Sequence, residues 1–317
     1  MSLRSPSAHP KAGLPHAVEV YEVGPRDGLQ NESAALSVET KLEFIERLMA
    51  SGLSVIEATS FVSPKWVPQL GDADDLFPKL PKRANLRFPV LVPNANGLER
   101  AVTAGATQIA VFASATESFA KNNLNRSVDE ALAMFEPVVQ TARSNAMWVR
   151  GYVSMCFGDP WEGEVALGQV VGVCRRLVDM GCDQLSVGDT IGVATPGHVH
   201  DLLESLASAG IQTGQVAVHF HDTYGQALSN TLAALEAGVA TVDASAGGLG
   251  GCPYAKSATG NLATEDLVWM LHGLGVQTGI DLDALIGTSE WMAAQLGRPS
   301  PSRVVRALAS ERQQREN

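Results

Sequence analysis

The chain has 317 residues, a length that suits one large α/β domain with extensions rather than a minimal domain. Hydrophobic residues make up 45% of it and charged residues 18%, so it can bury a large core. A formal net charge of −11, with no Lys/Arg-rich stretch, argues against nucleic-acid binding, which needs a basic face. No apolar run approaches the roughly 20 residues that cross a bilayer, so we expect no membrane association.

The two ends are predicted to lie outside the main domain. Residues 1–16 contain prolines and scattered charge but lack the apolar core of a secretory signal, so we expect a disordered or expression-derived tail. Residues 17–300 are expected to form one domain, and residues 301–317 a polar, helical tail. Because no targeting signal is recognised, the expected location is the cytoplasm.

Short β-rich segments alternate with helical patterns along the chain. The predicted strands are 17–23, 54–60, 86–92, 108–114, 148–155, 184–189, 215–221 and 241–246. Several of these are nearly continuous in Val, Ile, Ala and Leu, which is typical of parallel strands covered on both faces. The intervening segment 37–52 places Leu42, Ile45 and Leu48 on one helical face, and a glycine follows several such segments as a C-cap signal.

Eight β units, each followed by helical sequence, predict a (β/α)8 barrel of the TIM type. The alternative is a doubly wound open sheet, but no GxGxxG motif follows the first strand. Residues 261–275 and 281–297 are predicted to add C-terminal helices.

Polar residues gather at the predicted carboxyl ends of these strands. In a (β/α)8 barrel the catalytic groups lie at those ends, so we expect these side chains to converge. They are Arg26, Asp27, Glu57, Ser60, Arg150, Tyr152, Asp189, Thr190, His219 and His221.

The motif "HFHD" is the most specific of these features. His219 and His221 are two residues apart in a strand, so both project to one face. For this motif alone, two buried hydrogen-bonded histidines explain the pattern as well as a metal site does. With Asp27 converging from the first strand, the motif favours a site for a divalent cation such as Mg²⁺ or Mn²⁺.

A glycine-dense segment, "AGGLGGCPYAKSATGN", follows the last strand at 246–261. It is either a flexible linker or a loop that closes near a substrate, and its Cys, Pro and Tyr favour the loop. Cys252 is predicted to be an exposed thiol able to exchange protons. Cys156, Cys174 and Cys182 form no CxxC pair and are predicted to be buried, reduced thiols.

Together these stretches resemble the 3-hydroxy-3-methylglutaryl-CoA lyases, a metal-dependent family of (β/α)8 barrels. The resemblance runs from about residue 17 to about residue 295. It is carried by "EVGPRDGLQNE", "GLSVIEATSFVSPKWVPQ", "GDTIGVATPG", "VHFHDTYGQALSNTL" and "GGLGGCPYAKSATGNLATEDLV". It implies metal-assisted cleavage of 3-hydroxy-3-methylglutaryl-CoA, an acyl-CoA, into acetyl-CoA and acetoacetate, in leucine degradation and ketone-body formation. It also implies a homodimer.

The resemblance implies roles for individual residues. The implied metal ligands are Asp27, His219, His221 and Asn261. The implied catalytic residues are Arg26, which faces the enolate, together with Glu57, Asp189 and Cys252. Substrate binding is expected from Arg26, Ser60, Lys121, Arg150, Tyr152, Thr190 and Gly248.

Three alternatives stay open at this point. Related enzymes cleave longer branched 3-hydroxyglutaryl-CoA thioesters, and the sequence does not reveal pocket size. Condensing acyl-CoA synthases of the same superfamily typically carry an acidic residue where this chain has Leu29. A non-enzymatic barrel would be expected to have lost part of the metal set, which is complete here. One departure from the family is Asn122, where relatives tend to have a second Lys after the counterpart of Lys121.

Overall fold

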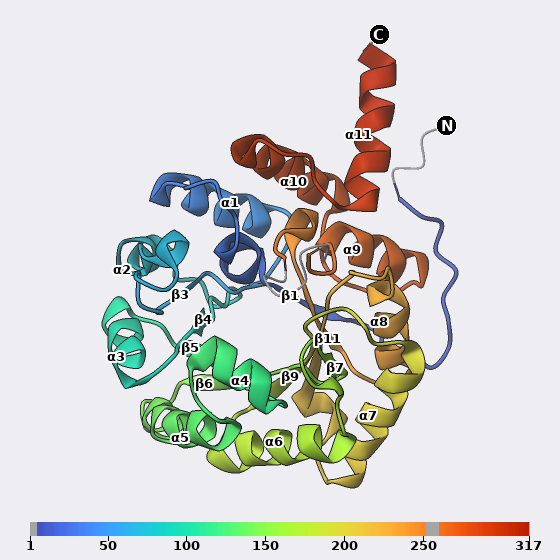
Figure 1. The fold of residues 1–317 in the computed structure, drawn as a ribbon. Coiled ribbons are helices and arrows are strands. Elements are labelled where there is room, and N and C mark those ends of the chain that lie inside the picture. Colours follow the sequence, from blue (N-terminus) through green and yellow to red (C-terminus); the bar gives the residue numbers. More distant parts are fainter. Residues whose placement is uncertain (1–4, 252–259, 317) are drawn as a thin grey trace.

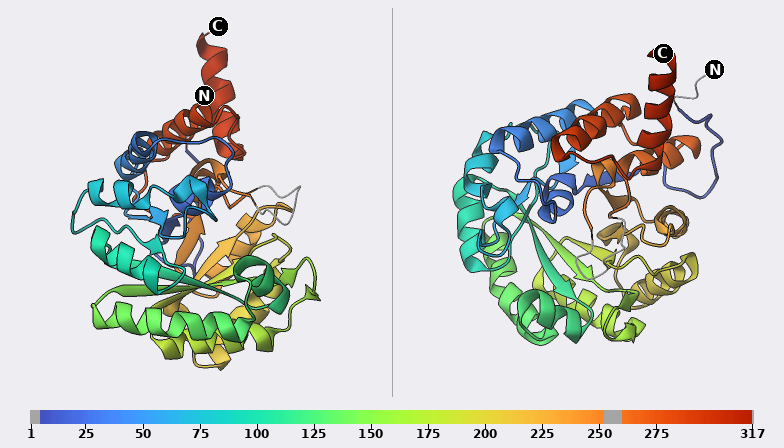
Figure 2. Two further views of the ribbon diagram at one scale, coloured as in Figure 1. Left: turned by 60° about the vertical axis from the view of Figure 1, so that its left-hand side comes forward. Right: turned by 45° about the horizontal axis from the view of Figure 1, so that its top comes forward.

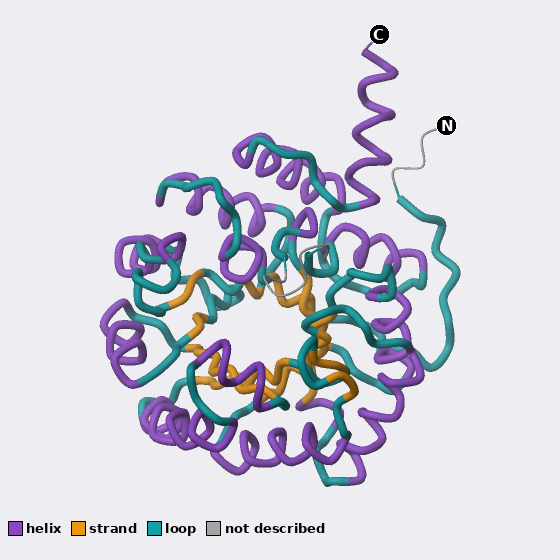
Figure 3. The backbone as a smooth tube through the Cα atoms, viewed as in Figure 1, coloured by secondary structure: helices purple, strands orange, loops and turns teal. Residues whose placement is uncertain are grey.

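The structure is a computed structural model that describes residues 5–251 and 260–316. A ring of strands lies at its centre, and helices surround the ring on the outside (Figure 1). Coloured by secondary structure, the backbone shows the same two layers, with the strands inside and the helices outside (Figure 3). In the described residues, no helix has the length and apolar content needed to cross a membrane.

The strands form a parallel sheet. Its members are β1 (Glu19–Glu22), β2 (Val55–Ile56), β3 (Thr59–Ser60), β4 (Val90–Leu91), β5 (Gln108–Ser114), β6 (Trp148–Ser154), β9 (Gln184–Asp189), β10 (Val216–Phe220) and β11 (Thr241–Ala244). Within the described residues the order is β2-β1-β11-β10-β9-β6-β5-β4-β3. The strands at the two ends of this order, β2 and β3, come from one short stretch of chain. Hydrogen bonds from Ile56 N to Arg87 O and from Ala58 N to Pro89 O join this stretch to the segment that leads into β4.

Helices follow the strands in alternation. Those around the sheet are α1 (Val38–Ala50), α2 (Ala73–Leu76), α3 (Ala95–Ala104), α4 (Glu117–Leu124), α5 (Val128–Ser144), α6 (Leu167–Met180), α7 (Pro196–Ser208) and α8 (Ala227–Glu236). The C-terminal helices are α9 (Thr264–Gly273), α10 (Leu282–Leu296) and α11 (Arg303–Glu316), and α11 projects from the body of the molecule (Figure 2). The predicted α/β class, parallel sheet and C-terminal helices are confirmed.

Short elements complete the chain. A single π-helical turn, η1 (Gly24–Gly28), follows β1, and β7 (Gly158–Asp159) pairs with β8 (Gly163–Glu164) as an antiparallel hairpin. The 3₁₀ turns are η2 (Pro68–Leu70), η3 (Phe77–Lys79), η4 (Thr213–Gln215) and η5 (Ala246–Gly248).

Local sequence explains where several elements begin and end. The Ser37 side chain accepts the Thr40 amide at the start of α1, and Ser127 forms a capping box with Glu130 at the start of α5. Of the predicted strand 86–92, only Val90–Leu91 is formed as strand. Pro89 has no N–H to donate to a ladder, which shortens the strand.

The alternation of side chains along the strands separates two environments. Val149, Val153, Val187 and Val218 are buried in the large apolar cluster between the sheet and the helices. The residues that alternate with them point into the ring, and this set is unusually polar for a protein interior. It includes Arg150, Tyr152, Ser186, His219 and Asp243, all of them buried or half-buried.

Candidate metal centre and active site

The described residues contain one group of side chains that could hold a metal ion, formed by Asp27, His219 and His221. One ligand atom from each lies within 4.8 Å of the others. His219 belongs to β10 and His221 follows it, so the period of the strand aims both imidazoles into the ring. Asp27 reaches them from η1, where the Val23 carbonyl accepts the amides of Arg26, Asp27 and Gly28. The convergence predicted from the sequence therefore occurs for these three residues.

Asn261 lies beside this group. Its Nδ2 donates to Asp27 Oδ2 at 2.7 Å and to Leu249 O at 3.1 Å. Its Oδ1 is buried and has no hydrogen-bond partner among residues 5–251 and 260–316. A backbone bridge between His221 and Asn261 fixes this amide next to the second histidine.

The donor atoms of this group fit a divalent cation. The Nε2 atoms of His219 and His221 face each other at 3.2 Å, so two neutral imidazoles could direct two lone pairs at the same point. The Asp27 carboxylate and the unpaired Asn261 Oδ1 add oxygen donors beside them. Nitrogen and oxygen ligands of this kind are accepted by Mg²⁺ and Mn²⁺, and a cation would satisfy an amide oxygen that is buried and has no partner among the described residues.

Electrostatics place Asp27 and His221 in metal-binding protonation states. Burial would raise the pKa of Asp27, but the positive charge of Arg26 and the hydrogen bond from Asn261 lower it below its ordinary value. Burial lowers the pKa of His221 to about 4, with repulsion from His219 adding to the effect. At neutral pH Asp27 is therefore a carboxylate and His221 a neutral imidazole, the forms that coordinate cations.

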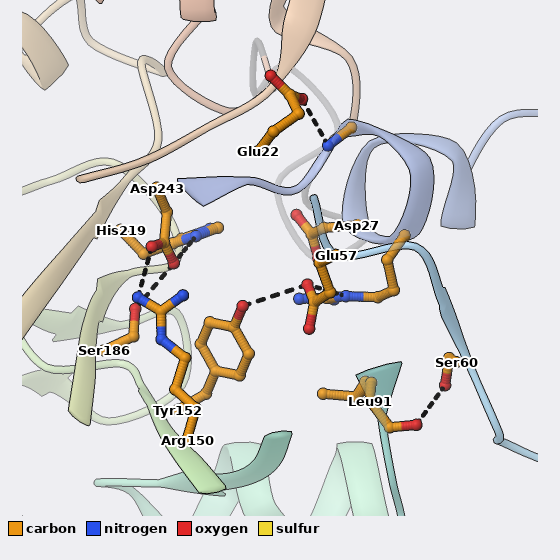
Figure 4. Close-up of polar contacts among 12 residues, drawn as sticks. Glu22, Asp27, Glu57, Ser60, Leu91, Arg150, Tyr152, Ser186, His219 and Asp243 are labelled. Carbon is orange, nitrogen blue, oxygen red and sulfur yellow. Dashed lines mark hydrogen bonds and ion pairs between the residues drawn. The ribbon is translucent and has the colours of Figure 1, made fainter. Parts of the chain in front are cut away.

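Arg26 connects this group to a second carboxylate. Its Nη1 donates to Asp27 Oδ1 at 2.6 Å, and its Nε donates to Glu57 Oε2 at 2.7 Å. The Tyr152 hydroxyl also donates to Glu57 Oε2, at 3.2 Å (Figure 4). Burial raises the pKa of Glu57 even though Arg26 opposes the shift. Three of the predicted site residues thus form one hydrogen-bonded cluster next to the candidate metal ligands.

Asp189 and Thr190 organise the backbone at the end of β9. The Asp189 carboxylate accepts the amides of Val193 and Ala194, at 3.0 and 2.9 Å, and burial raises its pKa to about 6. Its carbonyl accepts the His221 amide. The Thr190 hydroxyl accepts the Met155 amide at 2.9 Å. Both residues lie next to the histidine strand.

The other predicted site residues lie at different depths. Ser60 is buried and donates to Leu91 O at 3.4 Å. Gly248 is buried in η5 with φ of +68°, whereas Lys121 is exposed on α4. Arg150 is fully buried, and its Nη2 donates to Asp243 Oδ1 at 2.6 Å. Cys252 lies outside the described residues, while Cys156, Cys174 and Cys182 are buried free thiols, as predicted.

Four buried polar residues that support the site were missed at the sequence level. Glu22 accepts the amides of Gly24 and Ala246 at 2.8 Å and the Thr264 hydroxyl at 2.7 Å, so it ties η1 to η5. The other three are Ser186, Asp243 and Glu265. A carboxylate within an otherwise apolar strand, as in "AVEVYEV" and "TVDASA", is the signal that could have revealed Glu22 and Asp243.

Comparison with known proteins defines the class. The chain belongs to the HMGL-like family, whose model matches residues 17–292. The mitochondrial hydroxymethylglutaryl-CoA lyase of Rattus norvegicus is 49% identical over 306 residues, 96% of this chain and 94% of that protein. The corresponding protein of Arabidopsis thaliana is 51% identical over 296 residues, 93% of this chain. The alignment spans only 63% of the length of the Arabidopsis protein.

A solved structure agrees with these relatives. The hydroxymethylglutaryl-CoA lyase of Pseudomonas aeruginosa superposes with a TM-score of 0.92 at 45% identity. The match covers 94% of this chain and 99% of that one. The family resemblance seen in the sequence is confirmed.

Proposed function

We propose that this protein is a carbon–carbon lyase that cleaves 3-hydroxy-3-methylglutaryl-CoA into acetyl-CoA and acetoacetate. The observation that carries the proposal is the convergence of Asp27, His219 and His221 beside Arg26, in a chain about half identical to hydroxymethylglutaryl-CoA lyases over nearly its full length.

In this proposal Asp27, His219, His221 and Asn261 hold Mg²⁺ or Mn²⁺. When bound, such a cation polarises the hydroxyl and carboxylate oxygens of the substrate and lowers the pKa of the hydroxyl. The support is the unpaired Asn261 Oδ1 and the facing Nε2 atoms of the two histidines.

Arg26 is proposed to stabilise the charge that develops on the thioester oxygen. Within the described residues its hydrogen bonds use Nε and Nη1, which leaves Nη2 for a substrate oxygen. Glu57 and Asp27 fix the plane of the guanidinium before substrate arrives. A donor held in place in this way needs no reorganisation during the reaction, and only 8% of the side chain is exposed to competing water.

Protons are proposed to move through acidic groups of the site. A base, Glu57 or Asp189, takes the proton of the C3 hydroxyl, whose oxygen becomes the ketone of acetoacetate. The C2–C3 bond breaks and its electron pair passes to C2, giving the enolate of acetyl-CoA. Cys252 then supplies the proton that completes acetyl-CoA. Burial raises the pKa of both carboxyl groups, and its value of about 6 for Asp189 allows that carboxyl group to exchange a proton near neutral pH.

Several finer assignments belong to the same proposal. We infer that the parallel sheet is the closed (β/α)8 barrel of the family, with β2 and β3 as one strand and residues 17–300 as the lyase domain. Substrate contacts are proposed for Ser60, Lys121, Tyr152, Thr190 and Gly248. Arg150 was also predicted to bind substrate, and that stays a prediction. So do the homodimer, the cytoplasmic location, and the roles in leucine degradation and ketone-body formation.

The test is an assay of the purified protein with 3-hydroxy-3-methylglutaryl-CoA and excess Mg²⁺ or Mn²⁺, following acetoacetate. A longer branched 3-hydroxyglutaryl-CoA thioester is run in parallel. Metal-dependent release of acetoacetate confirms the proposal. Cleavage of the longer thioester alone keeps the reaction but changes the substrate, and cleavage of neither overturns the proposed function.

A further inference from the structure

A buried carboxylate lies behind the histidine pair. Asp243 of β11 is the register neighbour of His219 on β10, so the two side chains project from adjacent strands to the same face. Its Oδ2 lies 3.2 Å from Nδ1 of His219 (Figure 4). The other ring nitrogen of His219, Nε2, faces His221.

Two further side chains hold this carboxylate in place. Ser186 donates to Asp243 Oδ2 at 2.9 Å from β9, the strand on the other side of β10, and Arg150 donates to Oδ1 at 2.6 Å from β6. The Arg150 guanidinium also lies over the ring of Tyr21, 3.8 Å from its centroid. Asp243, Ser186 and Arg150 have essentially no exposed surface.

A buried ion pair of this kind is a poor source of stability, because removing two charges from water offsets most of their attraction. A well-packed apolar pair would fill the same space inside the ring at less cost. The presence of Arg150 and Asp243 at this depth is therefore better explained by what the carboxylate does for its third partner, the imidazole of His219.

The geometry determines which nitrogen of His219 carries a proton. A carboxylate accepts hydrogen bonds and cannot donate one, so Nδ1 must donate to Asp243. In a neutral imidazole Nε2 then keeps its lone pair, directed at the group formed by Asp27 and His221. His221 lacks such support, since its Nδ1 has no hydrogen-bond partner in the part of the chain that the structure describes.

We propose that Asp243 is a positioning residue of the metal centre: its carboxylate, fixed by Arg150 and Ser186, holds His219 as the Nδ1–H tautomer with Nε2 turned to the cation. The inference rests on the proposed function, because it presupposes a cation between Asp27 and the two histidines. Outer carboxylates of this kind typically change metal affinity by 10- to 100-fold.

The first test is a calorimetric titration of the metal-free, full-length protein with Mn²⁺. Asp243→Asn, which keeps the shape but removes the charge, is expected to weaken Mn²⁺ binding by about 10- to 100-fold. The matched control is Asp266→Asn. That carboxylate is also buried but bonds Ser302 and the amides of Arg303 and Val304, so Mn²⁺ affinity should stay within about twofold of the unmodified protein.

The second test observes the unmodified protein, so it does not depend on the folding of a variant whose buried ion pair is broken. Nitrogen-15 spectra of histidine-labelled, metal-free protein at pH 8.5 are expected to show His219 protonated on Nδ1 and bare on Nε2, with the signals assigned by their loss in His219→Gln. The Nε2–H tautomer would overturn the inference.

The experiments distinguish a failure of the proposed metal site from a failure of the role proposed for Asp243. If the unmodified protein binds no Mn²⁺, or if His219→Gln binds it equally well, the proposed metal site is wrong. If the unmodified protein binds Mn²⁺ and a folded Asp243→Asn binds it equally well, the metal site holds and only the role of Asp243 is overturned.

Discussion

Arg26 donates from Nε to the Oε2 of Glu57 at 2.7 Å, a bond that joins the turn after β1 to the segment between β2 and β3. The same guanidinium reaches back to Asp27 through Nη1. Neighbours in a strand would point to opposite faces, but the π-helical turn of η1 brings both side chains into the ring. Arg26 and Asp27 are therefore part of the candidate site and are not solvent-exposed turn residues.

Replacing Arg26 with Met should lower kcat by about 10²–10³, because the donor for the developing enolate is lost. The assay is steady-state cleavage of 3-hydroxy-3-methylglutaryl-CoA at saturating Mg²⁺. Arg100→Met is the control, since Arg100 pairs with Asp74 at the surface and should leave kcat within about twofold. A kcat for Arg26→Met within threefold of the unmodified enzyme would rule out the assigned role.

Removal of the divalent cation should abolish turnover, and added Mg²⁺ or Mn²⁺ should restore it. His221→Ala should weaken Mn²⁺ binding by at least about 10-fold, because a buried nitrogen ligand is lost. His200→Ala, at an exposed position on α7, should bind Mn²⁺ as the unmodified protein does. Full activity in protein shown by elemental analysis to be free of metal would contradict this prediction.

Three features could be predicted from the sequence for physical reasons. They are the parallel sheet, the C-terminal helices and the candidate metal-ligand group. Two histidines that are two positions apart in a strand point to the same face of the sheet. The carboxyl ends of parallel strands meet at one edge of that sheet, which brings their side chains together. Asp243 and Ser186 were missed because the contacts of Asp243 with Ser186 and Arg150 join strands that are neither consecutive in the chain nor adjacent in the sheet: Arg150 and Asp243 are 93 positions apart. A single sequence reports periodicity within a strand but not which side chains of different strands meet inside the ring.

Free energy of unfolding should depend on pH through Glu265. Burial raises its pKa to about 8, and its carboxyl group accepts the Gly247 amide at 2.9 Å and the Ser289 hydroxyl. The folded state therefore holds this proton more tightly than the unfolded state does. The associated stability is fully present at low pH and is lost as pH rises from about 4.5 to about 8.

Urea unfolding between pH 6.5 and 8.5 measures this effect. Glu265→Gln should make the decline with pH shallower by up to about 1.4 kcal/mol per pH unit. Glu164→Gln, at an exposed position on β8, should leave the slope unchanged. An unchanged slope in Glu265→Gln would mean that Glu265 is already ionised in the folded protein.

Gly260 is predicted to be essential for placing Asn261 at the metal site. A Cβ at position 260 would overlap the carbonyl oxygen of Gly250 and lie 2.8 Å from that of Gly248. These are backbone atoms of the turn that also carries Leu249, whose carbonyl accepts from Asn261 Nδ2. Because backbone cannot move aside as a flexible side chain does, Gly260→Ala must displace Asn261.

Gly260→Ala should lower the free energy of unfolding by about 1–3 kcal/mol and weaken Mn²⁺ binding by about 10-fold or more. Urea unfolding and calorimetric titration measure the two effects separately. The control is Gly168→Ala on α6, where an added Cβ meets no atom within 4 Å and alanine favours the helix. That variant should bind Mn²⁺ normally and unfold at an equal or higher urea concentration. If Gly260→Ala matched this control in Mn²⁺ affinity, the close backbone contact between Gly250 and Gly260 would not be what positions Asn261. The amide would then be held by its hydrogen bonds to Asp27 and Leu249.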